Sequence, residues 1–230
     1  MSTASDDPKR RAALRAVDEV VSGMVVGLGT GSTAGHAVRE IAARLRDGRL
    51  AGIVGVPTSE ATARIARDGG IPLATLDDRP RIDITIDGAD EVDPELDLIK
   101  GLGGALLREK LVACASHRVL IAVDSSKRVE RLGTGAPVPV EVVRFGWSAT
   151  RARLERLGAH PSLRTTASGD PFVTDEGHLI LDCRFGPIAD KRALAAAIHA
   201  ETGVVEHGLF LGIASRVIVA TPAGIEDLHR

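Results

Sequence analysis

Short apolar runs alternate with amphipathic stretches over the first 130 residues, and this alternation constrains the fold more than any other feature. Strands are predicted for the apolar runs at 25–28, 53–56, 82–87 and 119–124. Helices are predicted between them at 33–46, 59–68 and 105–116. Strands that alternate with helices are typical of a parallel sheet covered by helices on both faces. The pattern therefore predicts an α/β fold with a Rossmann-like parallel-sheet domain.

The pattern changes near Gly133 to a mixed α+β order. Strands are predicted at 138–143, 172–174, 179–183 and 203–205, and helices at 148–157 and 190–201. The residues 175–177 form the turn of a predicted hairpin, and Pro139 favours an edge position for its strand because proline has no N–H to donate. This order is similar to a split β-α-β unit. Two further strands, at 209–211 and 217–220, are predicted to return to the first sheet.

The chain length of 230 residues leaves room for two modest domains, at about 150 residues per domain. We expect a Rossmann-like catalytic domain at 1–132 and a smaller inserted α+β domain at 133–206. The C-terminal segment 207–230 is expected to return to the catalytic domain.

Composition excludes several classes of function. Lys and Arg number 29 against 31 Asp and Glu, which argues against a nucleic-acid footprint over the whole chain, and the absence of Tyr removes most stacking platforms. No apolar stretch reaches 18 residues, so no membrane span is expected. The polar stretch from Met1 to Arg11 lacks a signal peptide, which favours the cytoplasm. Cys114 and Cys183 lie in apolar runs and are expected to be buried, inert thiols.

A segment rich in glycine and hydroxyl groups, Gly29 to Thr33, follows the first strand. Ligands bind beyond the carboxyl ends of strands in an open parallel sheet, and a helix N-terminus offers N–H groups to an anion. The hydroxyls of Thr30, Ser32 and Thr33 add donors, which suits a phosphate monoester. A tight turn with a hydroxyl N-cap explains the same residues. The loose dinucleotide fingerprint also matches, but no acidic residue closes the second strand.

A dense group of carboxylates, from Asp87 to Asp93, follows the third strand. Carboxylates paired at a strand end can divide the roles of acid and base between them. A solvated acidic turn and a divalent-metal site are the alternatives. The spacing does not match an EF-hand, and the seven histidines are scattered without zinc spacing.

Charged residues also mark the third helix and the end of the fourth strand. Lys100 precedes a glycine-rich turn into the helix, and Glu109 has apolar neighbours one turn away on either side, which suits a general base. Arg108 and Lys110 have similar neighbours, so an exposed charged face explains the pattern as well. Lys127 can neutralise a phosphate as a point charge, or it is a surface lysine beside an ordinary N-cap.

Together these blocks resemble the type A ribose-5-phosphate isomerase family. The matching blocks are 26–33, 87–91, 100–110 and 124–127, with 139–142, 208–210 and 221–222 in addition. They keep their order and spacing over nearly the whole chain. The resemblance implies interconversion of ribose 5-phosphate and ribulose 5-phosphate in the pentose phosphate pathway, without metal or organic cofactor. It also implies a Rossmann-like domain with a smaller ferredoxin-like domain, in homodimers or homotetramers.

The resemblance assigns roles residue by residue. Glu109 stands where the family has its proton-transferring base, and Lys100 matches its active-site lysine. Asp87 and Asp90 match its active-site aspartates. The expected substrate-binding residues are Thr30, Gly31, Ser32, Thr33, Gly88, Ala89, Gly101, Leu102, Gly103 and Lys127. Leu102 stands where many members have glycine, which is expected to stiffen that loop.

The chemistry of the residues agrees with an enediol pathway. Glu109 is expected to move a proton between C1 and C2, while Asp87 helps to open the sugar ring. Lys100, positioned by Asp90, is expected to stabilise the developing oxyanion, and the phosphate is expected on the loop 29–33. Three alternatives remain open: an amino-sugar phosphate deaminase, a non-catalytic sugar-phosphate sensor and a dehydrogenase. The sensor is weakened because the sequence has no basic helix-turn-helix segment.

Overall fold

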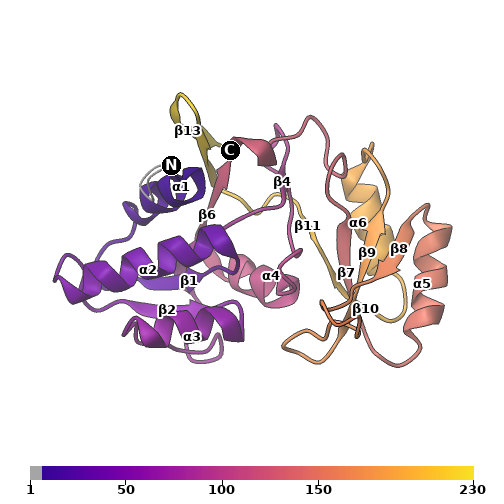
Figure 1. Cartoon of the computed structure of the whole chain (residues 1–230), viewed down its shortest axis with the longest axis horizontal. Coiled ribbons are helices and arrows are strands. Elements are labelled where there is room, and N and C mark those ends of the chain that lie inside the picture. The colour runs from indigo at the N-terminus through magenta and orange to yellow at the C-terminus, as the bar shows by residue number, and fades with distance from the viewer. Residues whose placement is uncertain (1–6) are drawn as a thin grey trace. The chain divides into compact units, whose positions relative to one another are not determined.

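The structure, a computed structural model, describes residues 7–230. They form two compact units (Figure 1). Unit 1 comprises the described residues up to Ala89, together with Arg108–Lys127 and Gly212–Arg230. Unit 2 comprises Asp90–Leu107 and Arg128–Leu211. The predicted boundaries placed 90–107 and 128–132 in the first domain, whereas these segments belong to the second compact unit. Whether the units fold as separate domains stays a prediction.

A six-stranded sheet forms the centre of unit 1, in the order β13-β12-β6-β3-β1-β2. Its strands are β1 (Val25–Leu28), β2 (Val54–Pro57), β3 (Ile82–Asp87), β6 (Ser116–Asp124), β12 (Arg216–Thr221) and β13 (Gly224–His229). All neighbouring strands are parallel except β12 and β13. The α/β fold predicted from the alternation is therefore confirmed, and the unpredicted β13 extends it by one antiparallel edge strand.

Helices cover both faces of this sheet. They are α1 (Pro8–Val17), α2 (Ser32–Arg46), α3 (Glu60–Asp68) and α4 (Leu106–Cys114), and a 3-10 turn, η1 (Ser125–Lys127), follows β6. Val26 packs into a large aliphatic cluster with α1 and α2, while Val25 packs into a smaller cluster with Val112 of α4. Adjacent residues of a strand face opposite sides, so apolar burial on both faces fixes the sheet in the middle of the unit.

A four-stranded antiparallel sheet forms most of unit 2, in the order β10-β7-β9-β8. The elements are β7 (Val138–Val142), α5 (Trp147–Arg156), β8 (His160–Leu163), β9 (Leu179–Arg184), α6 (Lys191–His199) and β10 (Val204–His207). This chain order and strand order are those of a ferredoxin-like fold. A second, small sheet contains β4 (Glu91–Val92), β5 (Leu98–Ile99) and β11 (Leu209–Phe210).

Three predictions for this region were wrong. Pro139 does not mark an edge strand, because β7 lies between β9 and β10. The Pro139 carbonyl accepts the Gly208 N–H at 2.7 Å, one residue after the end of β10. Pro139 therefore lies where the pairing of β7 with β10 ends, and its missing N–H interrupts no further pairing with that strand. The segment 172–174 forms only an isolated bridge, from Val173 to Leu179, and β9 pairs with β8 instead. The segment 209–211 contributes β11 to the small sheet rather than to the large one.

Buried carboxylates fasten the segment 90–107 to the rest of unit 2. Glu91 accepts the backbone N–H groups of residues 133, 135 and 136 over 2.6–2.7 Å. Lys191 of α6 forms ion pairs with Asp93, Glu95 and Asp97, at 2.7 Å in the case of Asp97. These contacts explain why the second compact unit begins at Asp90 rather than at 133.

The two cysteines differ from each other. Cys183 is buried, and burial raises the pKa of its thiol to about 12, as expected for an inert thiol. Cys114 is exposed, so the prediction of burial was wrong for this residue. Among residues 7–230, no helix combines the length and the apolar character needed to cross a bilayer.

Candidate active site

The glycine- and hydroxyl-rich loop lies at a topological switch point of the parallel sheet. It joins β1 to α2, and β1 has β2 as its neighbour on one side and β3 on the other. Connections that diverge from neighbouring strands leave a crevice at their carboxyl ends, where α/β proteins bind ligands. Unit 1 therefore places the predicted phosphate loop where the fold favours a ligand.

Hydroxyl groups of residues that follow β2 hold this loop in place through hydrogen bonds. Thr30 Oγ1 lies 2.7 Å from Thr58 Oγ1, 2.8 Å from Ser59 Oγ and 3.1 Å from Thr62 Oγ1. The Thr62 hydroxyl donates to the Gly29 carbonyl at 3.0 Å. The Thr30 hydroxyl is thus used to fix the loop. Thr62 was missed by the sequence analysis, since its contact with residue 30 spans 32 positions of chain.

Asp87 joins the end of β3 to the same loop. Its side chain is 2% exposed, and its Oδ1 accepts the N–H groups of Thr30 at 3.2 Å and Gly88 at 2.8 Å. These bonds fix the carboxylate beside the loop, with its orientation set by backbone donors. A Cβ placed on Gly88 would lie 3.8 Å from Thr33 Cβ, so the start of α2 is close as well.

Replacing Gly29 by alanine is expected to lower the free energy of unfolding by about 1–3 kcal/mol, because the new methyl group overpacks the site. Its Cβ would lie 2.3 Å from Asp87 Oδ1 and 2.6 Å from Asp87 Cα. Gly35→Ala in α2 is the matched control: its Cβ meets only the flexible end of Arg39, and it should stabilise the helix by about 0.5–1 kcal/mol. Urea unfolding measures both, and equal midpoints for Gly29→Ala and the parent chain would contradict the packing argument.

The N-terminus of α2 is suited to hold an anion. Gly31 occupies its N-cap position with φ of 104°, a conformation that favours glycine, and it brings no side chain to cover the first N–H groups. The ammonium of Lys9, from α1, donates to Ser32 Oγ at 3.3 Å. Lys9 was missed by the sequence analysis because α1 was not predicted. The helix end and the lysine together favour a negatively charged group here.

A second cation of unit 1 follows β6. Lys127 is the last residue of η1, and its charge acts on Asp124 together with that of Lys9. Burial raises the pKa of Asp124, but hydrogen bonds from Ser126 and these two charges outweigh it and leave the pKa below its ordinary value. The carboxylate is therefore ionised at neutral pH. Its negative charge attracts both lysines to this end of the sheet.

Glu109 is the buried member of the three charged residues on α4. Its exposure is 4%, whereas Arg108 and Lys110 are half-buried. Arg108 is turned to the surface, where it forms a 3.0 Å ion pair with Glu60. The helical pattern did not show which of these three charged residues points inward. The structure shows that it is Glu109, whose carboxylate is withdrawn from bulk water.

Unit 2 brings together Lys100, Asp90 and the turn at 101–103. Lys100 is 3% exposed, and its backbone N–H donates to the Gly208 carbonyl at 2.9 Å. Asp90 Oδ2 accepts the Leu102 N–H at 3.0 Å, and the Asp90 N–H donates to Ile99 at 2.8 Å. Asp90 therefore holds the turn that follows Lys100, which is a positioning role.

Two further residues of unit 2 were missed. The Lys100 ammonium lies 5.5 Å from the centre of the Phe210 ring, a cation–π arrangement that orients the charge. Arg164 Nη1 donates to the carbonyls of Gly101 and Leu102 at 2.8 and 3.1 Å, and Asp182 pairs with the same guanidinium. Phe210 lies in the matching block 208–210 but was given no role, and Arg164 has no local sequence signal, because both contacts depend on the tertiary fold.

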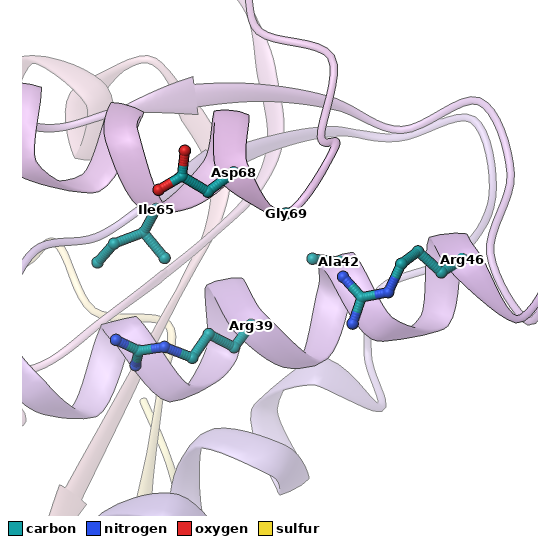
Figure 2. A pocket seen from close by; sticks show the side chains of 6 residues that line it. All are labelled: Arg39, Ala42, Arg46, Ile65, Asp68 and Gly69. Atoms are coloured by element: carbon teal, nitrogen blue, oxygen red, sulfur yellow. The ribbon is translucent and has the colours of Figure 1, made fainter.

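A surface pocket lies away from these residues, between α2 and α3 (Figure 2). It is lined by Arg39, Ala42, Arg46, Ile65, Asp68 and Gly69. None of the residues predicted for the site lines this pocket. Its arginines lie on the exposed side of α2.

Comparisons with known proteins agree on one family. The family model described as ribose 5-phosphate isomerase A (phosphoriboisomerase A) matches residues 54–224. Ribose-5-phosphate isomerase A of Roseiflexus castenholzii is 62% identical over 221 residues, which are 96% of this chain and 94% of the relative. The enzyme of the same name from Synechococcus sp. is 57% identical, with 98% of both chains covered.

Solved structures show the same similarity in three dimensions. A D-ribose-5-phosphate isomerase in complex with phospho-erythronic acid is 38% identical, with a TM-score of 0.95 and full coverage of both chains. Ribose 5-phosphate isomerase from Plasmodium falciparum is 40% identical, with a TM-score of 0.94 over 98% of this chain and 99% of the other. The similarity therefore extends over both compact units.

Proposed function

Because this chain belongs to the ribose 5-phosphate isomerase A family and is thus an isomerase, we propose that it interconverts D-ribose 5-phosphate and D-ribulose 5-phosphate through an enediolate. The reaction moves one hydrogen between C1 and C2 and leaves the oxidation state of the whole molecule unchanged. It requires a base for the carbon-bound proton, groups that move protons between oxygens, and positive charge near the developing oxyanion.

The phosphate binds to the loop 29–33 in this proposal. The Gly31 N-cap, the first N–H groups of α2 and the nearby Lys9 supply donors and charge, and Lys127 adds a second cation. The phosphate does not react, so its binding energy positions the sugar carbons. The hydroxyl cluster around Thr30 keeps the loop in shape before the substrate arrives.

Glu109 is the base that carries the proton between C1 and C2. The observation that carries this assignment is its burial on α4, where its charged neighbours are more exposed. Exclusion of water strengthens the electrostatic interactions in the site and protects the reactive enediolate. Asp87, oriented by two backbone N–H groups, assists ring opening and proton transfer at the oxygens.

Lys100 stabilises the oxyanion in this proposal, and Asp90 acts as a positioning residue through the turn at Leu102. A buried ammonium is a strong electrostatic partner, because the surrounding dielectric is lower than in water. The solved relative in complex with phospho-erythronic acid adds support. That ligand carries a phosphate and a carboxylate, and a carboxylate has the planar, delocalised negative charge of an enediolate.

Purified protein is expected to convert ribose 5-phosphate at an unchanged rate when EDTA is present, because the proposed chemistry uses only side chains. The measurement follows ribulose 5-phosphate formation with and without the chelator. Turnover that disappears on chelation and returns with a metal would overturn the side-chain mechanism. Absence of turnover in both conditions would overturn the proposed reaction itself.

The same preparation tests the alternatives named above. Ammonia release from amino-sugar phosphates would favour a deaminase. Substrate binding without turnover would favour a sensor, and a thermal shift on addition of NAD would favour a dehydrogenase. Family membership favours the isomerase over all three. A cytoplasmic location and a homodimeric or homotetrameric state belong to the same proposal.

A further inference from the structure

Folding gathers two histidines and a glutamate of unit 2 that are not adjacent in the sequence. His199 is the last residue of α6, and Glu206 and His207 close β10 (Figure 1). One potential ligand atom from each of the three lies within 4.8 Å of the other two. The two imidazole rings are perpendicular, with centres 6.2 Å apart. We propose that these three residues bind a divalent transition-metal ion, with Zn²⁺ as the best fit.

The donor set selects this class of ion. Two imidazole nitrogens and one carboxylate oxygen suit Zn²⁺ and its transition-metal neighbours, whereas Mg²⁺ and Ca²⁺ prefer oxygen ligands alone. Three protein ligands leave the fourth tetrahedral position for water. His199 is exposed, so an ion can enter from solvent, while His207 is 6% exposed and forms the inner side of the site.

Backbone contacts already hold the two ligands on β10. The His207 N–H donates to Glu206 Oε1 at 2.7 Å, and the Leu209 N–H approaches His207 Nδ1 at 3.3 Å. His207 Nδ1 lies 3.9 Å from Glu206 Oε1. With bond lengths of about 2.0–2.1 Å, a tetrahedral Zn²⁺ holds its ligand atoms about 3.3 Å apart. Binding thus replaces the long Leu209 contact, and rotation of the exposed His199 side chain closes the remaining gap.

The ion would act as a cross-link and not as a catalyst. It would join the end of α6 to the end of β10 across the connection 200–203. Gly208, the next residue, accepts the Lys100 N–H at 2.9 Å, so the cross-link would also stiffen the segment that supports Lys100. A ligand that binds only the folded state stabilises it by mass action. The proposal is independent of the isomerase assignment.

The test uses the full chain, stripped with EDTA and then titrated with ZnCl₂. We expect one Zn²⁺ per chain by calorimetry and a Tm higher by several degrees at saturation, with no comparable rise for MgCl₂. CoCl₂ should give the visible absorption bands of a four-coordinate Co²⁺ site. His199→Ala removes an exposed ligand at a helix end, so the variant folds, and it should bind Zn²⁺ at least about tenfold more weakly.

Two further variants complete the design. Glu206→Gln removes the carboxylate charge and should weaken Zn²⁺ binding in the same way as His199→Ala. His160→Ala is the matched control, because His160 is an exposed histidine of β8 in the same unit, and its Zn²⁺ response should equal that of the parent chain. An unchanged Zn²⁺ affinity in His199→Ala, no Zn²⁺ response in the parent chain, or an equal shift with MgCl₂ would each overturn the proposal.

Discussion

Glu109→Gln is expected to fold like the parent chain and to lose at least about 100-fold in kcat, within the 10²–10⁴-fold range typical of a lost proton-transfer group. The amide keeps the size of the carboxylate, so packing around the buried side chain is preserved. It has no basicity for the carbon-bound proton, so the chemical step fails while phosphate binding continues. KM should therefore change much less than kcat. Steady-state kinetics with ribose 5-phosphate and a thermal melt measure these quantities.

Glu60→Gln is the matched control for this variant. It makes the same chemical change at an exposed carboxylate of α3, where it disturbs the surface ion pair with Arg108 of α4. Its kcat should equal that of the parent chain, since such pairs contribute little. In D₂O, Glu109→Gln should also stop exchange of the C2 hydrogen of the substrate with solvent. Normal exchange or a kcat within threefold of the parent chain would remove Glu109 from the proposed role.

Lys100→Met is expected to reduce kcat by about 10²–10³-fold, the usual effect of removing a group that stabilises an oxyanion. Methionine fills much of the same volume, so the buried site and the backbone bond to Gly208 remain. The lost ammonium is the one oriented over Phe210. Because the charge matters most in the transition state, the loss should appear in kcat rather than in KM.

Lys127→Met provides the contrast. This lysine is proposed to neutralise the non-reacting phosphate, so its removal should raise KM and leave kcat nearly unchanged. The two variants together separate a cation at the reacting end from a cation at the phosphate. If Lys100→Met raised KM and kept kcat, Lys100 would have to be reassigned to the phosphate.

Regular patterns in the sequence were enough to predict most elements of the fold. The strands at 82–87 and 119–124 and the helices α2, α3 and α4 lie within a few residues of their predicted ranges. The failures have local causes. Helix α1 buries Ala12, Ala13 and Ala16, and such small residues give a weak apolar signal. The N-cap Asp7 and the following proline were the signals that could have found it.

The candidate site was predictable by residue type but not by orientation. Residues 108, 109 and 110 are each rotated by about 100° from the next along the helix, and only tertiary packing decides which of them is buried. Lys9, Arg164 and Phe210 contact site residues that are distant in the sequence. The same reason explains why scattered histidines gave no sign of the cluster at His199 and His207.

The chain crosses from one compact unit to the other four times, after residues 89, 107, 127 and 211. A fragment consisting of 133–206 would leave behind the carboxylate of Glu91, which fastens its beginning, and that of Asp97, which fastens Lys191 near its end. The ferredoxin-like part at 133–206 therefore cannot be transferred by itself without losing contacts that hold it. A chimera of two homologous proteins should exchange the segment 133–206 together with 90–107. Otherwise the transferred segment lacks the carboxylates of Glu91 and Asp97 that hold it.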